Sequence, residues 1–272
     1  MSDQGQNVKS AQRTLELLEV VARHPNGVTF VELAEQLPYP KSSLHGLLHT
    51  VVAMKWLTLD PDDRRYSIGV RPWEVGQAFR RSRDIVIRAR RYLREANEAL
   101  DETVQLGILD DLDVVYLDKV EGTKPLRLVS NVGSRLPAYV TGIGKALLSG
   151  LPDRVLRERF AGQELPGYTS RTITSGDRLI EVLAEVRRQG YATDDGEYSH
   201  GVYCVALPIM NRQRQVAAAL SFSVPKARVD NGEVSSDRMI EVLRVASHAI
   251  SRALDTASSA GEAPRLAEGR AE

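Results

Sequence analysis

The 272-residue sequence predicts an α+β protein of two domains joined by a helical linker. Three observations predict this class. Residues 8–70 hold three helix-length segments and then a short polar hairpin. Residues 71–84 begin an arginine-rich helical stretch. Residues 85–255 combine hairpins with flanking amphipathic helices, a pattern typical of an α+β domain and not of a doubly wound parallel sheet.

Composition limits the function classes. Apolar residues make up 42% and charged residues 26% of the chain, which is ordinary for a soluble globular protein. The formal net charge is zero, so any nucleic-acid-binding surface must be local. The single cysteine, Cys204, fits a reducing cytosol. We find neither a signal peptide nor a run of roughly 20 apolar residues, and we expect a cytoplasmic protein without membrane contact.

Periodicity and capping predict the first two helices. Apolar residues recur at helical spacing from Ser10, and this helix ends near residues 24–27. Thr29-Phe-Val-Glu32 is a capping-box pattern, in which the threonine hydroxyl and the glutamate each bind the other residue's backbone amide. A second helix therefore begins at Thr29, and Pro38 and Pro40 end it.

A third helix and a hairpin complete the first domain. The helix is predicted from Lys41 to about Met54, because leucines and a valine form an i, i+3, i+4, i+7 stripe. Residues 56–59, 60–65 and 66–68 are then predicted as strand, turn and strand. This order is that of a winged helix-turn-helix, which places its recognition helix in the DNA major groove.

The exposed side of the third helix favours phosphate contact. No Asp or Glu occurs between Leu37 and Leu59, although 36 of the 272 residues are acidic. Helix-capping serines, a solvated histidine face and ordinary turn cations are the alternatives for these side chains. We predict DNA contacts from Lys41, Ser42, Ser43, His45, His49, Thr50, Lys55, Arg64 and Arg65.

The i, i+4 spacing of His45 and His49 also resembles a zinc pair. A zincin motif requires glutamate directly after the first histidine, where this chain has Gly46, and no third ligand is near in sequence. We expect no metal and no cofactor.

The remaining elements follow from charge and alternation. Residues 71–94 carry eight arginines against two acids, a balance of +6 that predicts a basic connector with a domain boundary near Arg83. The chain after 256 is predicted to be a disordered tail. The predicted strands are 104–110, 114–120, 126–129, 204–210 and 216–224; the predicted helices are 85–100, 145–149, 177–188 and a last one along 239–254.

Three motifs of the second domain invite a catalytic interpretation. Thr141-Gly-Ile-Gly-Lys145 lacks the first glycine and the Ser or Thr of a Walker A loop. Asp194, Asp195 and Glu197 are either paired carboxylates or a solvated acidic loop. His200 and Cys204 would share one face of a strand, but no nucleophile motif surrounds the cysteine. These patterns favour a protein that is not an enzyme.

Ten short motifs, in this order, together resemble the IclR family of bacterial transcriptional regulators over roughly residues 8–255. The first domain contributes Val8–Leu15, Leu33–Ala34, Pro40–His45, Leu47–Leu48 and Tyr66–Gly69. The second contributes Gly133–Pro137, Thr141–Ala146, Gly190–Glu197, Gly201–Ile209 and Ala219–Ser223.

The resemblance implies a winged helix-turn-helix, a linker helix and a GAF-like effector-binding domain that act as a dimer or tetramer on palindromic operators. The matching effector positions are Gly142, Ile143, Asp194, Val202, Cys204, Ser221 and Ser223, with Leu136, Tyr139 and Tyr203 as candidate walls. Val202 and Cys204 share strand parity, as do the two serines. One departure is Gly46, where family members commonly carry arginine.

We therefore expect a ligand-responsive transcriptional repressor that binds DNA and a small organic acid or a carbonyl or aromatic metabolite. One alternative is an enzyme acting on a small metabolite, with the Asp194/Cys204 region as its site. Another is a winged-helix protein that contacts other proteins without DNA.

Overall fold

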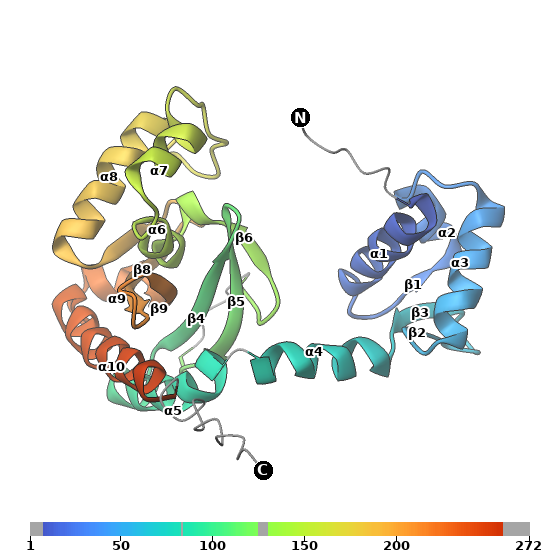
Figure 1. Cartoon of the computed structure of the whole chain (residues 1–272), viewed down its shortest axis with the longest axis horizontal. Coiled ribbons are helices and arrows are strands. Elements are labelled where there is room, and N and C mark those ends of the chain that lie inside the picture. Colours follow the sequence, from blue (N-terminus) through green and yellow to red (C-terminus); the bar gives the residue numbers. More distant parts are fainter. Residues whose placement is uncertain (1–7, 83, 125–129, 258–272) are drawn as a thin grey trace, which may run out of the picture. The chain divides into compact units, whose positions relative to one another are not determined.

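The computed structural model describes residues 8–82, 84–124 and 130–257 (Figure 1). The predicted strand at 126–129 and nearly all of the predicted tail therefore lie outside the described residues. The chain divides between Arg83 and Asp84 into two compact units. Within the described residues, no helix has the length and the apolar composition that a membrane crossing demands.

The first unit is a small helical domain with a three-stranded antiparallel sheet in the order β1-β3-β2. Its elements are α1 (Lys9–Ala22), β1 (Val28–Thr29), α2 (Phe30–Gln36), α3 (Lys41–Ala53), β2 (Leu57–Leu59), β3 (Arg65–Ile68) and α4 (Val70–Ser82). Leucines from three helices and β2 form its core: Leu17, Leu33, Leu44, Leu48 and Leu57 are each at most 1% exposed.

The predicted capping box forms at the start of α2. The Thr29 amide donates to Glu32 Oε2 at 2.7 Å, and the Glu32 amide donates to Thr29 Oγ1 at 3.3 Å. The same threonine belongs to β1, a two-residue strand that the sequence analysis did not predict. Val28 and Thr29 pair with Tyr66 and Arg65 of β3, so the hairpin is fastened to the entry of α2.

The second unit contains a six-stranded antiparallel sheet in the order β6-β5-β4-β9-β8-β7. One face packs against α5 and α10, and the other packs against α6, with α7 and α8 outside it (Figure 1). Its elements are α5 (Asp84–Leu100), β4 (Thr103–Asp110), β5 (Asp113–Val120), β6 (Arg135–Pro137), the 3₁₀ turn η1 (Ala138–Val140), α6 (Gly142–Leu148), α7 (Asp153–Phe160), α8 (Gly176–Gln189), β7 (Ala192–Asp195), β8 (Val202–Met210), β9 (Val216–Pro225), α9 (Lys226–Asp230) and α10 (Ser236–Ala257).

Three local expectations are wrong. The helix expected from Lys145 begins at Gly142, because Thr141 Oγ1 caps it by accepting from the Gly144 amide at 3.0 Å. The acidic segment is not a solvated loop: Asp194 lies in β7 and is 4% exposed. His200 lies in the turn before β8, so it does not share a strand with Cys204.

Candidate functional site

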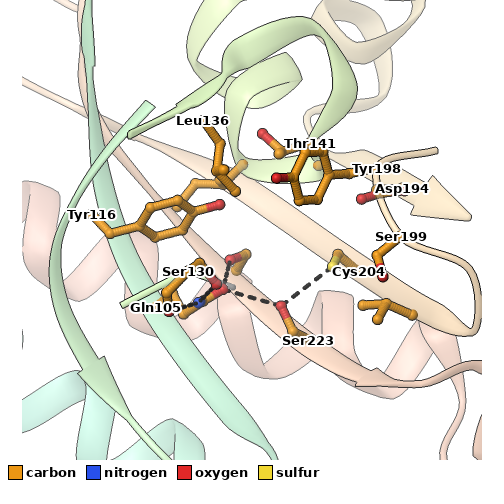
Figure 2. A pocket seen from close by; sticks show the side chains of 14 residues that line it. Gln105, Tyr116, Ser130, Leu136, Thr141, Asp194, Tyr198, Ser199, Cys204 and Ser223 are labelled. Atoms are coloured by element: carbon orange, nitrogen blue, oxygen red, sulfur yellow. Dashed lines mark hydrogen bonds between the residues drawn. The ribbon is translucent and has the colours of Figure 1, made fainter. Parts of the chain in front are cut away.

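A cavity of about 40 Å³ lies between the first turn of α6 and the adjacent face of the sheet (Figure 2). It is lined by all seven residues that the sequence analysis assigned to effector binding: Gly142, Ile143, Asp194, Val202, Cys204, Ser221 and Ser223. Seven others complete the lining: Gln105, Tyr116, Ser130, Leu136, Thr141, Tyr198 and Ser199.

Strand parity explains this convergence. In the antiparallel register, Cys204 lies opposite Ser223 and also opposite Asp194, so these side chains share the α6 face of the sheet. Tyr203 has the other parity, and its hydroxyl accepts from Ser236 at the start of α10. It does not line the cavity. Tyr139 does not line it either; its hydroxyl donates to the Pro166 carbonyl at 2.5 Å.

Gln105 organises the polar floor of the cavity. Its Nε2 donates to Ser130 Oγ at 2.5 Å, and its Oε1 accepts from Ser223 Oγ at 3.1 Å and from Ser221 Oγ at 3.4 Å (Figure 2). Both serine hydroxyl protons are thus engaged, and the oxygens present lone pairs to the cavity. The two serines therefore offer acceptors, and not donors, to a ligand. Gln105 was not predicted, and its signal in the sequence was one polar side chain at the inward parity of an apolar strand.

The glycine at the start of α6 makes room for the cavity. A Cβ on Gly142 would lie 3.4 Å from the Asp194 amide nitrogen and 3.4 Å from Cys204 Cβ. The amides of Gly142 and Ile143 belong to a first helical turn, which has no intrahelical acceptors for them. Such amides are suited to a carboxylate or carbonyl oxygen.

Asp194 is the carboxylic acid that lines the cavity. Its carboxylate accepts from the Glu197 amide at 2.7 Å, and burial raises its pKa to about 7. Near neutral pH it can therefore either donate or accept a hydrogen bond. Burial also raises the pKa of the Cys204 thiol, which stays neutral and is a poor nucleophile. Beside the cavity, the Lys145 ammonium is ion-paired with the buried Glu197 carboxylate.

The predicted DNA-contacting residues lie on α3 and the adjoining hairpin. Six of the predicted α3 and turn residues are exposed: Lys41, Ser42, His45, His49, Thr50 and Lys55. His45 and His49 line a groove of about 330 Å³ together with Arg64 from the hairpin tip. Lys55 and Arg64 both have left-handed backbones, with φ of 62° and 59°.

Three of the predicted DNA contacts are engaged inside the domain. Arg65 Nη1 donates to the Gly27 carbonyl at 3.0 Å, so this arginine holds the hairpin against the start of α2. The Thr50 hydroxyl donates to the Gly46 carbonyl at 2.9 Å, and Ser43 accepts from Arg13 at 3.4 Å. Neither Ser42 nor Ser43 caps α3, because its N-cap residue is Pro40, which makes no side-chain hydrogen bond.

Gly46 leaves an open position on α3. A Cβ built there would meet no atom within 4 Å. The absence of a side chain is therefore not required by packing, and the position can accept a long side chain such as arginine.

Two family models match this chain. The bacterial transcriptional regulator IclR C-terminal model covers residues 77–252, and the IclR helix-turn-helix domain model covers residues 10–61. The chain belongs to the IclR family. As a member of the IclR family it is a DNA-binding transcriptional regulator with a small-molecule effector domain and is not an enzyme, so the Asp194/Cys204 alternative is dropped.

Individual IclR-family relatives span nearly the whole chain. The regulator XynR of Escherichia coli (strain K12) is 34% identical over 91% of this chain and 97% of its own. The acetate operon repressor of Salmonella typhimurium is 34% identical over 84% of each. The crystal structure of Thermotoga maritima IclR has a TM-score of 0.74 at 28% identity over 90% of this chain and 98% of its own. An IclR homolog from Microbacterium hydrocarbonoxydans, solved with 4-hydroxybenzoate, shares the fold at 23% identity, with a TM-score of 0.78 over 90% and 98%.

Proposed function

We propose that this regulator is a repressor that binds a palindromic operator as a dimer or tetramer and responds to a small organic acid or carbonyl compound bound in the cavity at α6. The observation that carries this proposal is the convergence of seven predicted effector residues on one cavity. Repressor function is supported by relatives such as the acetate operon repressor of Salmonella typhimurium.

Cavity size and chemistry argue for the effector class. A volume of about 40 Å³ corresponds to roughly three water positions, so a compact acid fits with little rearrangement. The Gly142 and Ile143 amides suit a carboxylate oxygen, and a protonated Asp194 adds one donor. An aromatic acid such as 4-hydroxybenzoate would have to displace side chains first.

The DNA-binding mode follows from the exposed surface of α3. We propose that His45 and His49 face the major groove and that Lys41, Lys55 and Arg64 contact phosphates. Ser42 lies exposed near the α3 N-terminus, where a phosphate is favoured. Arg65, Ser43 and Thr50 would support the surface through their internal hydrogen bonds.

Self-association is supported by apolar side chains on the first unit. On α4, Trp73 is 65% exposed and Val75 is 55% exposed, and Leu15 of α1 is 62% exposed. Exposed aromatic and aliphatic groups of this kind mark association surfaces, and a second copy of the chain would cover them. Two copies would present two α3 helices to the two half-sites of a palindrome.

The effector can control repression only through a difference in affinity. An effector that binds more tightly to the arrangement in which the two α3 helices do not fit the half-sites disfavours operator binding. It lowers the affinity for the operator by the ratio of its own affinities for the two arrangements. We propose that the effector weakens operator binding, so that the compound that fills the cavity acts as an inducer.

Footprinting on DNA beside the protein's own gene tests the proposal. We expect a protected palindrome, and we expect protection to weaken when the best acid from a thermal-shift screen of C2–C6 carboxylates is added. Binding constants should fall steeply with salt, by about 0.9 in log–log slope for each phosphate contacted. A salt-independent interaction, or protection without any palindrome, would point instead to a winged-helix protein that contacts other proteins.

A further inference from the structure

A second cavity lies at the turn of the β8–β9 hairpin, against the C-terminal half of α10. Its volume of about 740 Å³ falls within the range of small-molecule sites. It is separate from the effector cavity: Cys204 lines one and Met210 the other, about 20 Å apart along β8. Within the part of the chain that the structure describes, this second cavity shares no lining residue with the effector cavity or with the groove along α3.

The second cavity is strongly cationic. It is lined by Arg212 and Arg214 from the hairpin and by His248, Arg252 and Asp255 from α10. Three arginines against one aspartate leave a local charge of +2 with the histidine neutral. This contrasts with the zero net charge of the whole chain.

These arginines are not used to hold the fold together. Within residues 8–82, 84–124 and 130–257, no ion pair or hydrogen bond engages the side chains of Arg212, Arg214 or Arg252. Other arginines of the same unit are paired: Arg187 with Asp153 at 2.7 Å, and Arg228 with Glu233 at 2.9 Å. Unpaired guanidinium groups that converge on one hollow are available to a ligand.

Arg214 lies in a rigid turn with a left-handed backbone. Its φ is 58°, in the left-handed region that favours glycine. The turn is held rigidly, since the Arg214 amide donates to the Asn211 carbonyl and the Gln215 amide donates to Asn211 Oδ1, each at 2.9 Å. The turn therefore holds Arg214 in a fixed backbone conformation at the edge of the cavity.

We infer that this cavity binds a phosphorylated small molecule that also carries a hydroxyl or amino group. Guanidinium groups match phosphate oxygens in geometry and charge, and His248 adds a further donor. Asp255 supplies a hydrogen-bond acceptor, because its Oδ1 is buried and lacks a hydrogen-bond partner among the described residues. It would accept from the ligand's hydroxyl or amino group.

Calorimetry on the full-length protein tests this inference with two probes, inorganic phosphate and ribose 5-phosphate. We expect ribose 5-phosphate to bind more tightly than phosphate. Arg214→Gly should weaken both by about tenfold, because one charge-assisted contact is lost. The same substitution removes the left-handed strain, so the unfolding midpoint should hold or rise. Asp255→Ala should weaken only ribose 5-phosphate.

The matched control is Arg157→Gln, which removes an exposed arginine of α7 on the other face of the sheet. Its affinity for both probes should equal that of the wild type. Equal affinities in Arg214→Gly and Arg157→Gln would overturn the inference, as would the absence of binding by either probe at millimolar concentration. Arg214-dependent binding of a polyglutamate peptide or of duplex DNA, with no binding of either small phosphate, would overturn it in favour of a macromolecular partner.

Discussion

Asp194 makes stability depend on pH. Burial raises its pKa from the ordinary 3.8 to about 7, so the folded chain holds its proton more tightly than the unfolded chain. Its contribution is fully present below about pH 4 and is lost as the pH rises to 7, by at most about 1.4 kcal/mol per pKa unit. Asp194→Asn keeps an acceptor for the Glu197 amide but cannot ionise.

We therefore expect the free energy of unfolding of Asp194→Asn to fall less than that of the wild type between pH 4 and 7. Urea titrations of both proteins across this range measure the difference, since other titrating groups are common to the two. Parallel pH profiles would show that Asp194 ionises normally.

Substitution of Arg64 can remove a charge from the β2–β3 hairpin, the wing of the winged helix-turn-helix, without unfolding it. Because its φ is 59°, Arg64→Gly should keep the hairpin and stabilise the chain by roughly 0.5–1 kcal/mol while weakening operator binding. The log–log salt slope should become shallower by about 0.9, the value of one phosphate contact. Asp111→Gly relieves a similar left-handed backbone in the β4–β5 turn and should leave DNA binding unchanged. An unaltered salt slope in Arg64→Gly would exclude a phosphate contact from the wing tip.

Gly46 permits the opposite experiment. Nothing lies within 4 Å of a Cβ at this position, so Gly46→Ala and Gly46→Arg should both stabilise α3, by about 0.5–1 kcal/mol. Only Gly46→Arg adds a charge to the surface expected to face DNA. We expect it alone to bind duplex DNA more tightly, with a steeper salt dependence, in fluorescence anisotropy. Equal gains in the two variants would assign the effect to helix stability.

At the scale of elements, two glycines of α6 have different roles: Gly144 is needed for packing, and Gly142 lines the effector cavity. A Cβ on Gly144 would approach the Ala138 carbonyl oxygen to 2.1 Å, so Gly144→Ala should disrupt the contact between α6 and η1 and unfold the second unit. On Gly142 the nearest atoms are 3.4 Å away, and the added methyl would enter the cavity instead. Gly142→Ala should therefore fold and bind the operator but lose its effector-induced thermal shift. A wild-type shift in Gly142→Ala would place the effector elsewhere.

Elements with long, regular patterns were predicted well, and those created by long-range partners were not. The expected helices 41–54 and 177–188 agree with α3 and α8 within one residue, because their apolar stripes are continuous. The two-residue β1 exists only through pairing with β3, about 37 positions later. In β7 the sequence Ala-Thr-Asp-Asp has little strand propensity, and β8 supplies its register.

The residues of the candidate cavity were likewise predicted in part. The family resemblance supplied Val202, Cys204, Ser221 and Ser223, and alternation along β8 and β9 predicted that the members of each pair share one face. Gln105 was missed because its role depends on hydroxyls more than 100 residues away, which no local pattern encodes. The first turn of α6 was not predicted, because it contains two glycines and glycine normally disfavours a helix.

At the scale of the whole molecule, the proposed palindromic operator would be recognised by two copies of the chain. A single winged helix-turn-helix contacts one half-site, whereas a dimer places two recognition helices about one helical turn of DNA apart. The 65% exposed Trp73 on α4 is the side chain best suited to hold such a dimer together, since a large, rigid aromatic group buries much apolar surface on association.

Trp73→Gln should therefore shift the protein towards monomers at micromolar concentration in sedimentation velocity. Because the effective concentration of the second half-site contact is lost, operator affinity should fall by at least tenfold, while affinity for a single half-site should stay the same. The control is Val132→Gln, which removes a 60% exposed apolar group from the second unit and should leave the oligomeric state intact. A Trp73→Gln protein that remains a dimer with full operator affinity would move the association surface away from α4, to an apolar face of the second unit.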